Sequence, residues 1–196
     1  LVGASVRLRR PRDQATLHFF WLCVAFFGVF TFSFNGPFDR LDWVFFWGDA
    51  VAMALLPALL LHFTLVFPER QLGSSTRPIR ALIPLMYVPA PILLGARVAL
   101  IMRGVTDGAA FSRTVELLDR GEHVYLFLAA STAAFVLGRA FGEITSLTGR
   151  RQLRWIASGT ILGVGPFALG YALPWALGVN PPLALQLTAI LLGLVP

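Results

Sequence analysis

Arginine-rich connectors alternate with long apolar segments along this chain, and the alternation constrains the fold more than any other feature. Ten arginines fall in every second connector: Arg7, Arg9, Arg10, Arg12, Arg70, Arg77, Arg80, Arg150, Arg151 and Arg154. The opposite connectors hold only Arg40, Arg103, Arg113 and Arg120. Basic residues are retained on the cytoplasmic side of polytopic membrane proteins. The pattern therefore predicts membrane-crossing helices, with the arginine-rich loops and the C-terminal end of the chain in the cytoplasm.

The composition agrees with a chain whose natural solvent is lipid. Hydrophobic residues make up 57% of it and charged residues 13%, whereas soluble domains average roughly 45–50% apolar residues. The mean hydropathy is +0.73. The net charge of +6 is spread over connectors rather than gathered on one face, which argues against nucleic acid as a partner. The lipid bilayer is the expected partner.

The apolar segments predict an all-α bundle that forms a single transmembrane domain over residues 1–196. The expected spans are 15–34, 43–67, 81–102, 123–147, 155–177 and a sixth, truncated one over 183–196. A full span of about 20 residues covers the ~30 Å hydrocarbon core. We expect a fragment that lacks a preceding span and a C-terminal output domain. The connector 103–122 is either a short surface helix or solvated coil, since Phe111, Val115 and Leu118 recur there at roughly helical spacing.

Ionisable residues inside the spans are candidates for ligand or signal recognition, because charge in a membrane is costly. The candidates are Asp49, His62, Arg139 and Glu143; Arg97 also lies within a span. Arg139 and Glu143 are four residues apart, so they share one helix face. With His62 they could form a polar cluster near the inner leaflet if the second and fourth spans are neighbours. Alternatively, Arg139 and Glu143 only neutralise each other, His62 bonds a backbone carbonyl, and Asp49 faces interfacial water.

Prolines give a second signal, in the third and fifth spans. Pro89, Pro91, Pro166 and Pro174 are the hinge candidates, because a proline removes a backbone hydrogen bond and kinks a helix. The alternative is ordinary tight packing, since proline and glycine are common in membrane helices.

No catalytic or metal-binding motif is present. The chain has no HExxH, Walker-type or GxSxG sequence. His18, His62 and His123 lack metal-ligand spacing, and Cys23 is the single cysteine. We therefore expect no catalytic residue, metal or cofactor in this segment.

Two sequence stretches carry a family resemblance. Residues 61–70 read LHFTLVFPER, and residues 150–174 read RRQLRWIASGTILGVGPFALGYALP. A span ending in His-Phe-x-x-x-Phe-Pro before a basic loop, followed later by Arg-Gln-Leu-Arg-Trp and a Gly/Pro-rich span, resembles the multi-span N-terminal region of bacterial ComP-like sensor histidine kinases. Similar regions also precede phosphatase-type output domains.

The resemblance implies a signal-input module of a two-component system in the bacterial inner membrane. The phosphoacceptor histidine and the ATP- and Mg²⁺-binding kinase domain would then lie beyond Pro196. Such kinases act as homodimers and pass phosphate to a cytoplasmic response regulator. Three alternatives remain open: a transporter or channel fragment, a structural anchor for a cytoplasmic domain, or a membrane enzyme acting on a lipid-like substrate at His62, Arg139 and Glu143.

Overall fold

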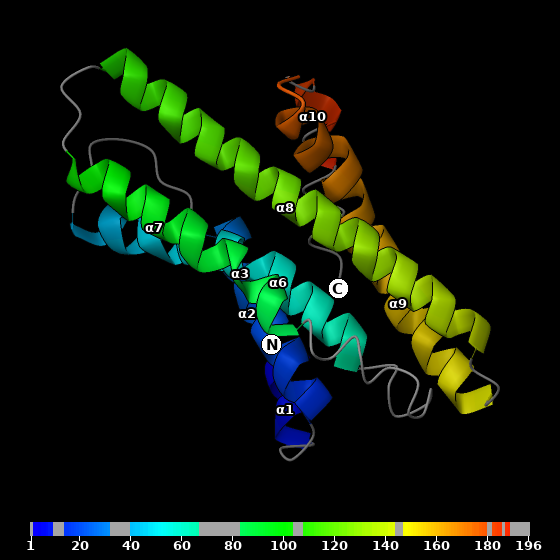
Figure 1. Cartoon of the computed structure of the whole chain (residues 1–196). Coiled ribbons are helices and arrows are strands. Elements are labelled where there is room, and N and C mark those ends of the chain that lie inside the picture. Colours follow the sequence, from blue (N-terminus) through cyan, green and yellow to red (C-terminus); the bar gives the residue numbers. More distant parts are fainter. Residues whose placement is uncertain are drawn as a thin grey trace.

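The protein is helical throughout the part that the computed structural model describes, and no strand occurs there (Figure 1). The described residues are 2–9, 14–31, 40–66, 83–103, 108–143, 147–179, 182–185 and 187–188. The helices are α1 (Val2–Arg9), α2 (Gln14–Thr31), α3 (Arg40–Val66), α6 (Ile83–Tyr87), α7 (Pro89–Met102), α8 (Gly108–Glu143), α9 (Leu147–Phe167), the π-helix η2 (Ala168–Ala172) and α10 (Leu173–Ala176). The all-α prediction is confirmed for these residues.

Three helical stretches are long and apolar enough to cross a membrane, namely Arg40–Val66, Ile83–Met102 and Ser112–Gly142. They correspond to the second, third and fourth predicted spans. The stretch Gln14–Val29 is apolar but shorter. Large apolar side chains such as Phe135 (70% exposed) and Trp155 (80% exposed) lie on the outside, which is typical of surfaces that face lipid. The full set of five or six spans stays a prediction, and residues 186 and 189–196 of the sixth lie outside the described residues.

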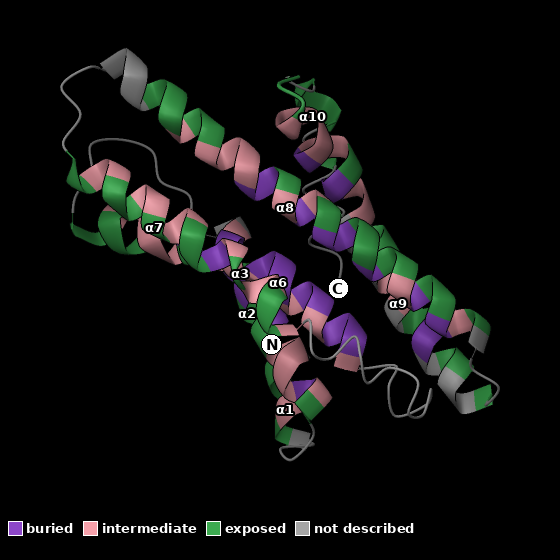
Figure 2. Cartoon of the chain, viewed as in Figure 1, coloured by how far each residue is buried: buried purple, intermediate pink, exposed green. Residues whose placement is uncertain are grey.

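The core sits where α3 crosses α2 and α8. Leu56 and Leu60 of α3 pack with Leu126 and Ala133 of α8 in one buried cluster. Figure 2 shows this buried zone along the C-terminal halves of α3 and α8, with exposed residues outside it. By contrast, α7 buries only Ala90. The second and fourth predicted spans are therefore neighbours, as a polar cluster between them would require.

The long helix α8 absorbs most of the connector that was expected as coil or a short surface helix. It begins at Gly108 rather than near His123 and runs for 36 residues, or about 54 Å at 1.5 Å per residue. The hydrocarbon core is only ~30 Å thick, so part of α8 projects beyond it. A salt bridge of 2.5 Å between Arg120 and Glu116, four residues apart, supports this projecting part.

The third predicted span is interrupted at Val88, between α6 and α7. Pro89 and Pro91 lie in the first turn of α7, where backbone N–H groups have no helical acceptor and proline is tolerated. The Val88 N–H donates to the Leu85 carbonyl at 3.2 Å, a tighter turn than the α-helix. The Tyr125 hydroxyl of α8 donates to the Met86 carbonyl. Val88 keeps α-helical backbone angles, with φ −59° and ψ −40°. The prolines thus interrupt the hydrogen-bond ladder, at a point here called the α6–α7 break, and a side chain of α8 contacts this point.

The fifth predicted span carries a second irregularity, the π-helix η2. The Leu173 N–H donates to the carbonyl of Ala168, five residues earlier, which is the π-helical pattern. Pro166 lies inside α9 just before this segment, and Pro174 opens α10 just after it. Each proline removes one backbone donor, so the regular i to i−4 ladder is interrupted on both sides. Single π-turns within α-helices are frequently found at functional sites.

Candidate functional site at the α8 junction

The most prominent polar site is an ion-pair cluster between α7 and α8, here called the Arg97 cluster. One nitrogen of Arg97, Nη2, donates to Asp119 Oδ1 at 2.7 Å and to Glu122 Oε1 at 2.9 Å. The side chains of Arg97 and Glu122 are only 13% and 6% exposed. Asp119 and Glu122 are three residues apart, so one face of α8 presents both carboxylates. This cluster holds together the half of the α7–α8 hairpin that lies nearer to its connecting loop.

Helix α3 closes the Arg97 cluster from a third side. The guanidinium lies over the Phe46 ring at 5.8 Å from its centroid, a cation–π arrangement. Asp49, one turn further along α3, interacts electrostatically with Arg97 and Asp119. The site therefore joins one guanidinium and two carboxylates of α7 and α8 to an aromatic ring of α3, and Asp49 is near enough to interact with them electrostatically. The Nε of Arg97 is buried and makes no hydrogen bond within the described structure, so the cluster does not use its full donor capacity.

His123 joins the same turn of α8 to the π-helix. Its Nδ1–H donates to the Asp119 carbonyl at 2.6 Å, which leaves Nε2 as the other polar atom of the ring. The ring packs against Tyr171 of η2 and Trp175 of α10, with centroids 5.4 and 6.1 Å away. The Trp175 Nε1–H in turn donates to the Tyr171 hydroxyl at 3.2 Å. Tyr171 and Trp175 are four residues apart and thus place two aromatic rings against one histidine.

Arg120 adds a second contact between α8 and the end of the fifth predicted span. Gly178 follows α10 with a backbone φ of +72°, a conformation that glycine adopts without steric cost. A Cβ at this position would lie 3.1 Å from the Arg120 guanidinium. The two turns of α8 from Asp119 to Tyr125, here called the α8 junction, therefore contact α7, the α6–α7 break and the η2–α10 segment.

A smaller polar group surrounds His62 on α3. Its Nδ1 forms a 2.9 Å hydrogen bond with the Tyr87 hydroxyl at the end of α6. The His18 ring of α2 lies 3.9 Å away between centroids. His18 itself donates through Nδ1 to the Gln14 carbonyl at 2.7 Å. His62 is thus bonded to a tyrosine hydroxyl, next to the α6–α7 break, rather than to the backbone carbonyl considered in the alternative interpretation.

The structure distributes the predicted site residues over different places. Asp49 lies near the Arg97 cluster and interacts with it electrostatically, and His62 contacts His18 and Tyr87. Arg139 is exposed on α8, and the side chain of Glu143 lies outside the described part of the structure. The Arg139–Glu143 pairing therefore stays a prediction. Within the described residues no group of three His, Cys, Asp or Glu side chains is arranged to hold a metal ion.

Sequence reasoning did not single out Arg97, Asp119 and Glu122 as a site. Two features of the sequence could have pointed to these residues. Arg97 lies inside an apolar span and needs an anion. The next helix offers Asp119 and Glu122 on one face, but both were assigned to a loop.

None of the family models, curated proteins or solved structures compared with this chain matches it. Function is therefore inferred from the residues and their geometry.

Proposed function

We propose that this chain is the membrane-embedded signal-input region of a bacterial sensor histidine kinase, which relays a stimulus through helix rearrangement to a cytoplasmic kinase domain. Two observations support this. The stretches 61–70 and 150–174 resemble such regions. In addition, the α8 junction contacts both interrupted helices, through Tyr125 at the α6–α7 break and through His123 at η2. The second observation carries the proposal, because a relay needs movable elements that share one contact.

The α6–α7 break is the element that moves first in this proposal. Its backbone bonds are already interrupted at Val88, and α7 is held to the rest of the bundle mainly by polar contacts and by few buried side chains. A stimulus that favours one position of α7 shifts the population by its differential affinity for the two arrangements. The Arg97 cluster and the Tyr125–Met86 bond then re-form or separate together, because their α8 partners lie within two turns.

The η2–α10 segment transmits the change in this proposal. His123, Tyr171 and Trp175 connect the α8 junction to a π-helix whose interruption by Pro166 and Pro174 makes it deformable. A shift of α8 changes the register of the aromatic contacts and hence the direction of the chain after α10. The kinase domain, with its ATP and Mg²⁺, would receive this displacement in a homodimer and pass phosphate to a response regulator.

The proposed location is the bacterial inner membrane, with the arginine-rich loops in the cytoplasm. Arg77→Cys and Arg151→Cys, each in a Cys23→Ala background, should react with a membrane-impermeant maleimide only in opened vesicles. Arg113→Cys, on the opposite side, should react in intact cells and serves as the matched control. Labelling of position 77 or 151 in intact cells would reverse the topology and remove the basis of the proposal.

The functional test uses the full-length protein in nanodiscs supplied with ATP and Mg²⁺. We expect an acid-labile, base-stable phosphoryl group, as phosphohistidine gives. Tyr125→Phe removes only the hydroxyl that bonds Met86, worth ~1 kcal/mol, so the ratio of active to inactive states should change by roughly five-fold. Pro166→Leu restores a backbone donor and should change basal output as well. Ser131→Ala, at an exposed position of α8, is the control and should behave like the wild type.

Two outcomes would contradict the proposal at different levels. A full-length protein that never acquires acid-labile phosphate excludes the kinase function. A kinase whose output is unchanged in both Tyr125→Phe and Pro166→Leu, at equal expression, excludes the relay through the α8 junction.

A transporter fragment is the second candidate, favoured by one observation. Both the third and the fifth predicted spans are interrupted helices, at Val88 and at η2, and interrupted helices line the substrate sites of many transporters. Flux of small cations or organic anions into proteoliposomes containing the full-length protein would support this candidate over the sensor.

A further inference from the structure

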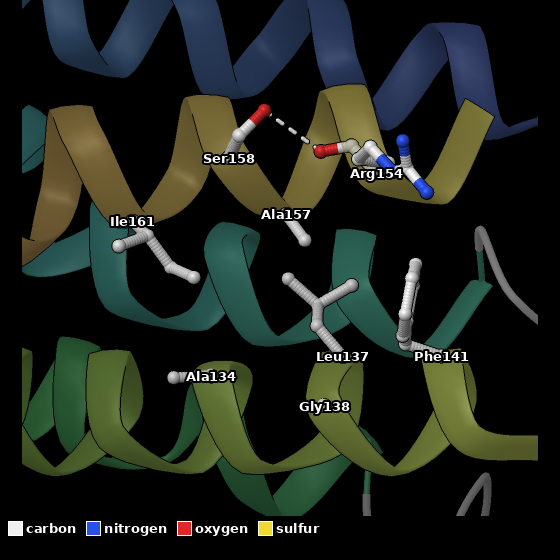
Figure 3. Close-up of a pocket in the computed structure, with 8 residues that line it drawn as sticks. All are labelled: Ala134, Leu137, Gly138, Phe141, Arg154, Ala157, Ser158 and Ile161. Carbon is white, nitrogen blue, oxygen red and sulfur yellow. Dashed lines mark hydrogen bonds between the residues drawn. The ribbon is translucent and has the colours of Figure 1, made fainter. Parts of the chain in front are cut away.

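A groove lies between α8 and α9, and the proposed relay does not use the residues that line it. Its volume is about 350 Å³, within the range of roughly 300–1,000 Å³ typical of small-molecule sites. Figure 3 shows Phe141 of α8 and Arg154 of α9 at one end, and Ala134 and Ile161 at the other. The α9 residues from 154 to 161 span about 10 Å. The groove is therefore an elongated slot that begins at an arginine.

The wall of the groove is apolar. The Ser158 hydroxyl, the one hydroxyl among the residues that line it, donates to the Arg154 carbonyl at 2.7 Å. The hydroxyl is thus occupied by its own helix. Leu137 and Phe141 of α8 and Ala157 and Ile161 of α9 supply carbon surface. Such a wall suits a hydrocarbon chain rather than a polar solute.

The groove is open because Gly138 of α8 has no side chain and α9 does not move in to fill the space beside it. On one side, Leu153 of α9 is fully buried against Leu137 and Ala140 of α8. At Gly138, however, an added Cβ would find no atom within 4 Å. Glycines in membrane helices usually permit close approach of a neighbour. Here the missing side chain leaves space that α9 does not fill.

The charge at the mouth of the groove is positive. Arg151 and Arg154 lie three residues apart on one face of α9, here called the Arg154 face, and both are exposed. The same face continues through Ala157, Ser158 and Ile161 into the groove. No Asp or Glu follows Glu143 in the sequence. Trp155, next to Arg154, is 80% exposed and is of the kind that marks a membrane–water interface.

We propose that this groove binds an anionic phospholipid of the bilayer, with one acyl chain between Gly138 and Ala157 and the phosphate at the Arg154 face. Basic pockets between helices on the cytoplasmic side suit phosphate head groups, each arginine near the surface contributing ~1 kcal/mol. Each buried methylene adds ~0.8 kcal/mol. The charge selects an anionic head group, and the slot selects a molecule with an acyl chain.

The test is native mass spectrometry of the full-length protein in detergent, titrated with palmitoyl-oleoyl phosphatidylglycerol or with phosphatidylcholine bearing the same chains. We expect one phosphatidylglycerol to remain bound at concentrations where phosphatidylcholine does not. Arg154→Gln should weaken phosphatidylglycerol binding roughly five-fold, as loss of ~1 kcal/mol predicts. Gly138→Leu should weaken it at least ten-fold, because the new side chain displaces several methylenes.

The matched control is Gly95→Leu on α7, where an added Cβ also meets nothing within 4 Å. It should bind phosphatidylglycerol like the wild type. If Gly138→Leu does not give a monodisperse helical protein, Ala157→Leu blocks the slot from the opposite wall. Glycerol 1-phosphate in excess should not displace the lipid, since it lacks the chain.

Several results would overturn the proposal. Equal binding of the two lipids removes the role of the Arg154 face. Unchanged binding in both Gly138→Leu and Ala157→Leu shows general annular association only. Displacement by glycerol 1-phosphate makes the site one for soluble phosphate. Disulfide cross-linking of Ile161→Cys to a second copy in native membranes, beyond that of the wild type, shows that the groove is covered by protein.

Discussion

The Arg97 cluster and the Arg154 face are both built on arginine, but the Arg97 cluster is buried and contains carboxylates, whereas the Arg154 face is exposed. Arg97 lies between helices and receives two carboxylates from α8 within 2.9 Å. Arg151 and Arg154 of α9 are exposed, and no Asp or Glu occurs between Glu143 and Pro196. A charge that the fold removes from solvent must find its counter-ion in the chain. A charge at the membrane surface can use water and lipid phosphate instead.

The largest expected effect separates the two regions by stability. Arg97→Ala leaves Glu122, which is 6% exposed, buried without its partner. Removal of one member of a buried ion pair costs about 3–5 kcal/mol, so the free energy of unfolding in detergent should fall by that amount. Unfolding by SDS, followed by circular dichroism, measures it. Arg113→Ala, at an exposed position of the same projecting part of α8, is the control and should change stability by about 0.5 kcal/mol or less. Equal losses of unfolding free energy in Arg97→Ala and Arg113→Ala would contradict the difference between the buried and the exposed arginine.

The second effect is expected only where anionic lipid is present. A ligand that binds the folded state at 100 times its Kd adds about 2.7 kcal/mol to stability. Phosphatidylglycerol should therefore raise the thermal unfolding midpoint of the wild type, and Arg154→Gln should reduce that increase. Arg113→Ala should retain it. A lipid-dependent increase that is the same in wild type and Arg154→Gln would assign the stabilisation to some other surface.

A smaller effect is expected at His62, which lies apart from both regions and uses a neutral partner. Tyr87→Phe removes the hydroxyl that bonds His62 Nδ1 at 2.9 Å, while the ring remains. Loss of one such bond costs about 0.5–1.5 kcal/mol. In the unfolding measurement used for Arg97→Ala, the loss of unfolding free energy in Tyr87→Phe should be the smaller of the two. A loss as large as that of Arg97→Ala would mean that His62 carries charge in the folded protein.

Features that depend on one segment alone could be predicted from the sequence. Apolar run length predicted the helices around Arg40–Val66 and Ile83–Met102, and the prolines predicted an irregular backbone hydrogen-bond ladder in the third span. These follow from local rules about backbone donors and hydropathy. The role of Pro89 and Pro91 as hinges stays a prediction. The start of α8 at Gly108 was missed, because charged residues in a helix that projects from the membrane look like those of a loop.

Features that depend on which helices are neighbours could not be predicted. The candidate set Asp49, His62, Arg139 and Glu143 was chosen by depth in the membrane. In the structure, Asp49 and His62 belong to separate groups, since the partners of each are set by how α3 crosses α2, α7 and α8. Arg97 was seen as an intramembrane charge, but its partners lay in a segment assigned to a connector. The register between two helices decides which acidic residue faces Arg97, and hydropathy does not determine that register.

The smallest expected effect sharpens the comparison within α8 itself. Arg120 and Glu116 form a 2.5 Å salt bridge, but their side chains are 37% and 47% exposed. Exposed pairs four residues apart couple by only about 0.3–0.5 kcal/mol, whereas close buried pairs couple by about 0.5–3 kcal/mol. Double-mutant cycles with Arg120→Ala and Glu116→Ala, and with Arg97→Ala and Glu122→Ala, measure the two coupling energies in the same detergent. The Arg97–Glu122 coupling should exceed the other and change little with salt, because burial limits screening. Equal coupling energies that fall together with salt would mean that distance, rather than burial, sets the strength of these pairs. The Arg97 cluster would then hold α7 no more strongly than an exposed ion pair would.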